Sequence, residues 1–162
     1  MFPMNIEKLW QILAQIPDPE IPVVSLVEMG IVREVEQTPE GHVTVTMTPT
    51  FSGCPALEVM KNDIDTRLKE AGVPNVTVRV VLAPPWTSDW ITEPARAKLK
   101  TFGLAPPKKH GGDFAVLLFD PVPCPYCNSE HTTLKNNWGP TPCRMIFYCN
   151  ACQQPFEQFK PL

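Results

Sequence analysis

Two Cys-x-x-Cys pairs in the last 40 residues restrict the fold of this chain more than any other feature. They are Cys124-Pro-Tyr-Cys127 and Cys149-Asn-Ala-Cys152, with 21 residues between them. Each pair can curl so that both thiols point at one ion, and an intervening hairpin would bring the pairs together. Four thiolates in a tetrahedron select zinc, or less often iron. The spacing therefore predicts a metal site formed by Cys124, Cys127, Cys149 and Cys152.

Disulfides are the alternative for such pairs. The N-terminus lacks the basic and apolar segments of a secretory signal, which favours a cytoplasmic location and reduced thiols. About 40 residues cannot build a sufficient core alone, so metal binding would supply the folding energy. A closed four-cysteine site has no open position for a substrate, so we expect a structural metal. Nearby Cys143 is either a core residue or a spare ligand, and a core position is favoured.

Proline limits the rest of the chain to short elements. It accounts for 20 of the 162 residues, about 12% against roughly 5% in average proteins. Scattered prolines make stiff corners and exclude long uninterrupted helices. We predict an α+β fold in three segments: a small mixed α/β, sandwich-like domain over 1–102, a linker over 103–120 and a zinc ribbon over 121–162.

Hydrophobic spacing predicts the elements of these segments. The expected helices cover 5–16, the segment from Cys54 to Gly72, and 91–102. The expected strands cover 28–36, 43–48 and 76–82, and the apolar run Phe114 to Phe119 reads as a further short strand. In the second helix we expect Cys54 at the N-cap, Pro55 at the first helical position and Gly72 as the stop.

Charge and motifs exclude several functions. The chain has 14 Lys and Arg against 17 Asp and Glu, a net charge of −3, which gives no electrostatic footprint for nucleic acid or anionic lipid. No apolar run approaches the roughly 18 residues of a membrane span. No dinucleotide-binding glycine motif is present. We therefore expect no nucleic-acid partner, no membrane association and no independent oxidoreductase activity.

Three other groups of residues are candidates for function. At a helix start, Cys54 would be favoured as a thiolate and could act as a nucleophile or metal ligand, while a buried packing role is equally compatible. Prolines hold Asp18 and Glu20 in one loop, where capping and solvation are the simpler explanation. Trp86, Asp89 and Trp90 fit a core and cap better than chemistry. The three histidines are dispersed and form no ligand set.

Three motifs together resemble a known domain. They are Asp-Pro-Glu-Ile-Pro at 18–22, Thr-Pro-Thr-Phe-Ser-Gly-Cys-Pro at 48–55 and Pro-Pro-Trp-Thr-Ser-Asp-Trp at 84–90. They resemble the domain shared by iron–sulfur assembly accessory proteins. With the cysteine-rich tail, which includes Trp138-Gly139-Pro140-Thr141-Pro142-Cys143, the whole chain resembles the D-type subunit family of bacterial phenylacetyl-CoA epoxidase systems. Asn128, Gln153 and Trp138-Gly139-Pro140 depart from the usual pattern in the loops.

The resemblance implies an accessory role in phenylacetate catabolism. Such a chain would assist maturation of a multicomponent monooxygenase by helping to insert iron–sulfur or iron centres, with the reductase or oxygenase subunit as client. Cys54 would then contact the cluster or the client, near Asp18 and Glu20, and no residue would be catalytic. The alternatives are a structural or coupling subunit retained in the complex and, less favoured, a cysteine-dependent enzyme, for which no histidine lies in a suitable motif. A homodimer is compatible with the sequence.

Overall fold

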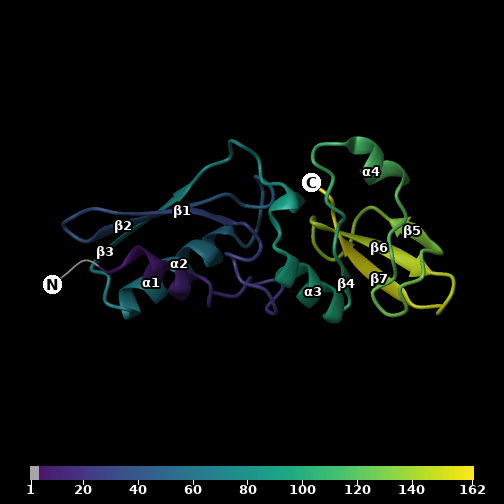
Figure 1. The fold of residues 1–162 in the computed structure, drawn as a ribbon, viewed down its shortest axis with the longest axis horizontal. Helices are drawn as coiled ribbons and strands as arrows, with labels where there is room; N and C mark the ends of the chain where they lie inside the picture. The colour runs from purple at the N-terminus through teal and green to yellow at the C-terminus, as the bar shows by residue number, and fades with distance from the viewer. Residues whose placement is uncertain (1–3) are drawn as a thin grey trace. The chain divides into compact units, whose positions relative to one another are not determined.

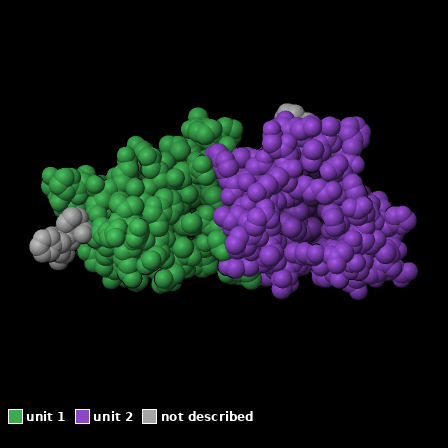
Figure 2. Space-filling view, in the orientation of Figure 1, with its two compact units in different colours: residues 1–86 green, residues 87–162 purple. Residues whose placement is uncertain are grey.

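The computed structural model describes residues 4–162, and its helices and strands are labelled in Figure 1. The chain divides into two compact units, residues 1–86 and residues 87–162 (Figure 2). Each unit combines a small β-sheet with α-helices, so the predicted α+β class is confirmed. Within the described part of the chain, no helix has the length and apolar character needed to cross a bilayer.

The first unit is a three-stranded sheet with two helices. Its elements are α1 (Ile6–Leu13), β1 (Val32–Gln37), β2 (His42–Met47), α2 (Leu57–Glu70) and β3 (Asn75–Val80). The strands lie in the order β1-β2-β3. β1 and β2 pair antiparallel as a hairpin, whereas β2 and β3 are parallel because α2 carries the chain back along the sheet.

Hydrophobic periodicity accounts for the core of the first unit. α2 buries Met60, Ile64 and Leu68, four residues apart, on one apolar face. Alternate residues of β2, Val43 and Val45 among them, are buried beneath the helices. α2 stops where predicted, because Gly72 adopts a φ of +97°, a left-handed conformation that favours glycine.

The second unit is a four-stranded sheet with short helices around it. Its elements are the 3₁₀ helix η1 (Ser88–Trp90), α3 (Glu93–Thr101), β4 (Leu104–Ala105), α4 (Phe114–Phe119), β5 (Thr132–Asn136), β6 (Arg144–Cys149) and β7 (Pro155–Phe159). The strand order is β4-β7-β6-β5. β5, β6 and β7 form an antiparallel meander, and β4 joins β7 in parallel.

Helix α4 replaces a predicted strand, and that prediction is wrong. The side chain of Asp113 accepts a hydrogen bond from the backbone N–H of Ala115 at 2.9 Å and so caps the helix. An uninterrupted run of six apolar residues fits a buried strand and a short helix equally well. The cap decides between them, and it lies outside the apolar run itself.

The two compact units differ from the three predicted segments. Helix α3 and residues 103–120 belong to the same unit as the ribbon strands. One reason is β4, because Leu104 and Ala105, inside the predicted linker, pair with β7. As domain boundaries, the predicted limits at 102 and 121 stay predictions.

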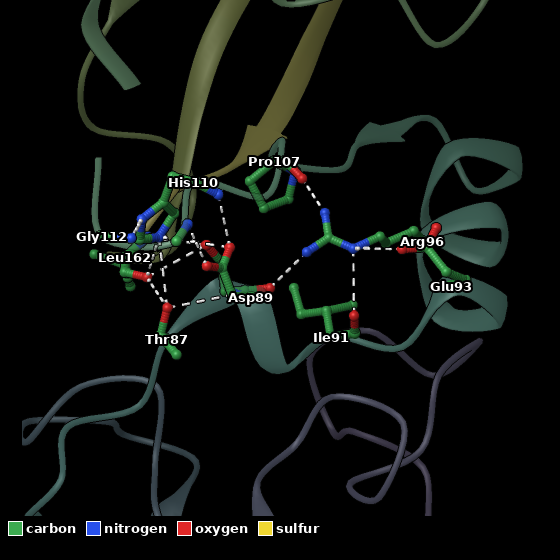
Figure 3. A network of polar contacts seen from close by, with 11 residues as sticks. Thr87, Asp89, Ile91, Glu93, Arg96, Pro107, His110, Gly112 and Leu162 are labelled. Atoms are coloured by element: carbon green, nitrogen blue, oxygen red, sulfur yellow. Dashed lines mark hydrogen bonds and ion pairs between the residues drawn. The ribbon is translucent and has the colours of Figure 1, made fainter. Parts of the chain in front are cut away.

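A buried arginine ties α3 to the predicted linker. Arg96 is 8% exposed, and its guanidinium donates to the carbonyl oxygens of Ser88 at 2.7 Å and Ile91 at 3.3 Å, and to that of Pro107 (Figure 3). All three acceptors belong to buried residues. Because an unpaired buried carbonyl is costly, Arg96 holds three backbone segments at once.

The polar residues that begin the second unit form the rest of this network. The Asp89 carboxylate accepts the backbone N–H groups of His110 at 2.9 Å and Gly111 at 2.7 Å. Burial raises the pKa of Asp89, but these two hydrogen bonds and the Coulombic attraction of His110 and Arg96 together outweigh it, and the pKa lies below its ordinary value. The carbonyl oxygen of Leu162 accepts the Thr87 hydroxyl and the Ser88 N–H, both at 2.8 Å (Figure 3). The end of the strand meander is thereby anchored to the segment before α3.

We expect Arg96→Met to destabilise the protein by about 3 kcal/mol, because each stranded buried acceptor costs roughly 1–3 kcal/mol. The measurement is the free energy of unfolding in urea. Lys109→Met is the matched control: Lys109 pairs with Glu93 at 3.0 Å, but both side chains are exposed, so its loss should leave stability nearly unchanged. Equal effects of the two substitutions would contradict the role assigned to Arg96.

Candidate metal centre

Four thiols from two turns converge in the second unit. Cys124 and Cys127 lie in the turn before β5, Cys149 is the last residue of β6, and Cys152 lies in the turn before β7. Their sulfur atoms all lie within 4.8 Å of one another. Two of the four residues, Cys124 and Cys149, are fully buried, whereas Cys127 is exposed. The structure thus brings together the four residues that the spacing predicted.

The sulfur separations match those of a tetrahedral thiolate site. The Cys124 and Cys152 sulfurs are 3.7 Å apart, and those of Cys127 and Cys149 are 3.6 Å apart. A metal–sulfur bond of about 2.3 Å in a tetrahedron separates neighbouring sulfurs by roughly 3.8 Å. A disulfide would need about 2.05 Å, and all six cysteines are free thiols. The chemistry and spacing of the donors fit a bound metal ion.

Two left-handed residues shape the turns that carry these thiols. Asn128 has a φ of 62° and Gln153 a φ of 58°, and each directly follows the second cysteine of its pair. Non-glycine residues adopt this conformation infrequently. The Asn128 N–H also donates to the Cys124 carbonyl oxygen at 2.9 Å, which closes its turn. Two of the three departures noted from the sequence, Asn128 and Gln153, are therefore the positions where each turn reverses direction.

Electrostatics favour a cation at this position. The backbone N–H of Cys152, 3.5 Å from the Cys149 sulfur, lowers the pKa of the Cys149 thiol to about 7, with the Ala151 N–H also contributing. Burial, together with the neighbouring thiols, raises the pKa of Cys152 to about 12. Without a cation the group therefore resists full ionisation, and a bound metal ion would supply the missing positive charge.

Cys143 lies outside this group. It is 5% exposed, and its sulfur lies 3.1 Å from the Thr141 hydroxyl oxygen. This placement confirms the favoured interpretation of Cys143 as a core residue.

Cys54 occupies a turn and not the start of a helix, so the predicted N-cap is wrong. α2 begins at Leu57, and its N-cap is Ala56, which makes no side-chain hydrogen bond. The Cys54 N–H donates to the Phe51 carbonyl and its own carbonyl accepts the Leu57 N–H, both at 3.2 Å. These two consecutive turns move the helix start by two residues, from Pro55 to Leu57. The half-buried Cys54 thiol is therefore placed by the loop between β2 and α2.

Asp18 is engaged in shaping its own loop. It is 8% exposed, and its Oδ1 accepts the backbone N–H groups of Glu20 at 2.8 Å and Ile21 at 3.1 Å. Glu20 is half-buried. The capping role considered from the sequence is present at Asp18, and it keeps the loop in one conformation. A shared site of Asp18, Glu20 and Cys54 stays a prediction.

Trp86 serves the core of the first unit. Its ring is 5% exposed and its indole N–H donates to the Met29 carbonyl at 2.9 Å. Sequence reasoning missed Arg96 because one arginine beside apolar positions in a helix resembles many exposed ones. No local signal distinguishes it, since its acceptors lie up to 11 residues away in the chain.

Comparison with known proteins assigns a family to each part of the chain. Residues 6–83 match the model "Iron-sulfur cluster assembly protein", and residues 114–160 match "PaaD zinc beta ribbon domain". The Fe-S protein maturation auxiliary factor of Porphyromonas gingivalis is 33% identical over 94 residues, which are 57% of this chain and 89% of the relative. A crystal structure from Bacillus anthracis, titled Domain of Unknown Function DUF59, is similar with a TM-score of 0.54 and 30% identity, covering 57% of this chain and 89% of its own.

One relative matches both parts. The Escherichia coli (strain K12) protein named as the D-type subunit of 1,2-phenylacetyl-CoA epoxidase is 42% identical over 158 residues, which are 98% of this chain and 94% of the relative. This similarity spans the residues of the chain that match the two family models. The chain therefore belongs to the PaaD family, the D-type subunits of 1,2-phenylacetyl-CoA epoxidase.

Proposed function

We propose that this chain is an accessory subunit of a phenylacetyl-CoA epoxidase system and assists the insertion of iron–sulfur or iron centres into that multicomponent monooxygenase. The observation that carries the proposal is the similarity of residues 6–83 to iron–sulfur assembly proteins within a chain related over its whole length to an epoxidase subunit. The reductase and oxygenase subunits of the system are the expected clients. The cluster or iron ion is cargo, not a resident cofactor.

Zinc is the metal proposed for the four-cysteine site. Cys124, Cys127, Cys149 and Cys152 would hold it, and all four donors are soft sulfur ligands, which zinc accepts in closed structural sites. Two of these residues belong to the buried cluster that also contains Phe147 and Phe156. Bound zinc would neutralise the thiolates and hold the turns before β5 and β7 together.

Cys54 is the residue proposed to contact the cargo. Its thiol is half-buried in a turn with hydrogen bonds on both sides. Phe51 supports this turn, since a Cβ at Gly53 would approach its ring to 3.1 Å. Thiolates are the usual ligands of iron–sulfur clusters. A preorganised thiol of this kind is suited to bind iron and to release it to a client.

A retained structural or coupling subunit is the second candidate. Large exposed apolar side chains on the second unit favour it, among them Trp138 at 68% exposure. The two candidates differ in whether the loaded enzyme needs the chain. Epoxidation by purified, fully metallated reductase and oxygenase should proceed without the chain if it is a maturation factor. It should require the chain if it is a coupling subunit.

For the metal site, we expect one zinc ion per chain and its loss in Cys124→Ser. Because Cys124 and Cys149 share a buried cluster with Phe147 and Phe156, loss of the ion should also unfold the ribbon strands. Elemental analysis measures the metal, and amide hydrogen exchange over residues 121–159 measures the fold. Cys143→Ser is the control, since it changes a buried thiol outside the group and should retain the ion. A fully folded, metal-free ribbon would contradict the prediction.

For Cys54, we expect Cys54→Ser to remain folded and zinc-loaded but to leave client centres underfilled. Serine preserves the size and backbone bonds of the turn but lacks the soft sulfur ligand. The assay is the iron and cluster content of reductase and oxygenase from cells whose only copy carries the substitution. It should fall severalfold, with phenylacetyl-CoA epoxidation.

Two further variants sharpen this experiment. Ser52→Ala alters the same loop without touching the thiol and should leave client occupancy normal. Asp18→Asn keeps an acceptor oxygen for the turn but removes the charge. Combined with Glu20→Gln, it tests whether the acidic loop acts by its charge. Full client occupancy with Cys54→Ser would assign Cys54 to packing and favour the coupling role.

A further inference from the structure

The second unit contains a cleft outside the metal centre and outside the network of Figure 3. It has a volume of about 440 Å³, within the range of clefts that bind ligands. Its floor is one face of the β5–β6–β7 meander, where Leu134, Met145 and Phe147 lie together. Val116 and Leu117 of α4 form part of its wall. The lining is therefore mostly apolar.

The rim of the cleft carries an excess of positive charge. Lys108 and Lys160 both line it, together with Asp120. Lys108 pairs with Asp120 at 3.4 Å. Lys160 has no carboxylate partner among the described residues, and its ammonium lies 4.5 Å from the centre of the Trp138 ring. One cation at the rim is thus left for an incoming negative charge.

Apolar surface continues outward from the cleft. Leu134 on the floor is 43% exposed, Trp138 beside Lys160 is 68% exposed, and Phe119 at the end of α4 is 81% exposed. A small molecule enclosed by the cleft would leave Trp138 and Phe119 in water. Exposed aromatic residues around an apolar depression are typical of surfaces that bind another protein.

We propose that this cleft binds a short segment of a client protein that combines apolar side chains with an acidic residue, the acidic residue pairing with Lys160. This inference rests on the proposed function for the identity of the client. The apolar side chains would occupy the floor formed by Leu134, Met145 and Phe147. Trp138 would cover the resulting ion pair and reduce its contact with water, which strengthens the attraction.

The chain offers a matched pair of lysines for the test. Lys160 and Lys135 each lie over an aromatic ring, Trp138 at 4.5 Å and Tyr148 at 5.5 Å. Only Lys160 lines the cleft. Tyr148 follows Phe147 on β6, so the Tyr148 side chain points to the face of the sheet opposite the cleft floor. Lys160→Glu and Lys135→Glu therefore change net charge equally and differ only in relation to the cleft.

The experiment measures the binding of overlapping synthetic peptides that cover the reductase and oxygenase subunits, by fluorescence anisotropy, to the full zinc-loaded chain. We expect at least one apolar, acidic peptide to bind, and Lys160→Glu to weaken it about tenfold, a change of about 1.4 kcal/mol. Leu134→Ser should weaken it as well, and Lys135→Glu should not. Zinc content of each variant reports that the ribbon is still folded.

Other results would overturn the proposal. These are no binding by any peptide, equal weakening by the two lysine variants, or preference for basic peptides. Tighter binding of phenylacetyl-CoA or of single-stranded oligothymidine would also overturn it, since either would assign the cleft to another class of ligand. The client metal assay on Lys160→Glu separates this outcome from failure of the proposed function. If Lys160→Glu weakens peptide binding as expected but leaves the client centres fully occupied, the cleft proposal stands and the maturation role alone is contradicted.

Discussion

The convergence of four thiols is the constraint on which the second unit depends. The buried cluster beside the ribbon turns consists of Ala105, Cys124, Phe147, Cys149 and Phe156, so two of its five members belong to the four-cysteine group. A cluster this small does not by itself offset the entropy of ordering the turns around it. The left-handed residues Asn128 and Gln153 show what the convergence requires, because each turn adopts an infrequent backbone conformation to direct its thiols inward.

Features of the structure could be predicted where one short pattern dictates one geometry. The spacing of the cysteines is sufficient to predict the four-thiol group. The four-residue period of Met60, Ile64 and Leu68 is sufficient to predict the buried face of α2. Prediction failed where two geometries share a pattern. Cys54-Pro55 has the composition of a helix start, yet turns from Phe51 to Leu57 come first. Phe114 to Phe119 is apolar throughout, and the Asp113 cap outside it decides for a helix.

The remainder could not be predicted because it depends on contacts that follow no local period. Arg96 is buried only because the carbonyls of Ser88, Ile91 and Pro107 surround it. Likewise, the cleft floor arises only after β5, β6 and β7 pair in register and α4 lies beside them. Neither arrangement has a local period or a fixed spacing. Both arrangements are therefore visible only in the tertiary structure. For this reason the sequence motifs predicted neither the Arg96 network nor the cleft.

Charge divides the proposed tasks between the two units. Residues 1–86 contain 11 acidic and six basic residues, whereas residues 87–162 contain six acidic and eight basic ones. A net charge of −5 on residues 1–86, which include the Cys54 loop, favours the approach of iron cations, and a net charge of +2 on residues 87–162 favours an acidic client segment. The chain as a whole is acidic, so the composition alone conceals the positive half. Each electric field is strongest near the charges that generate it and is screened by salt beyond about 10 Å. An accessory subunit organised in this way can therefore attract its cationic cargo with the negative unit and its acidic client segment with the positive unit.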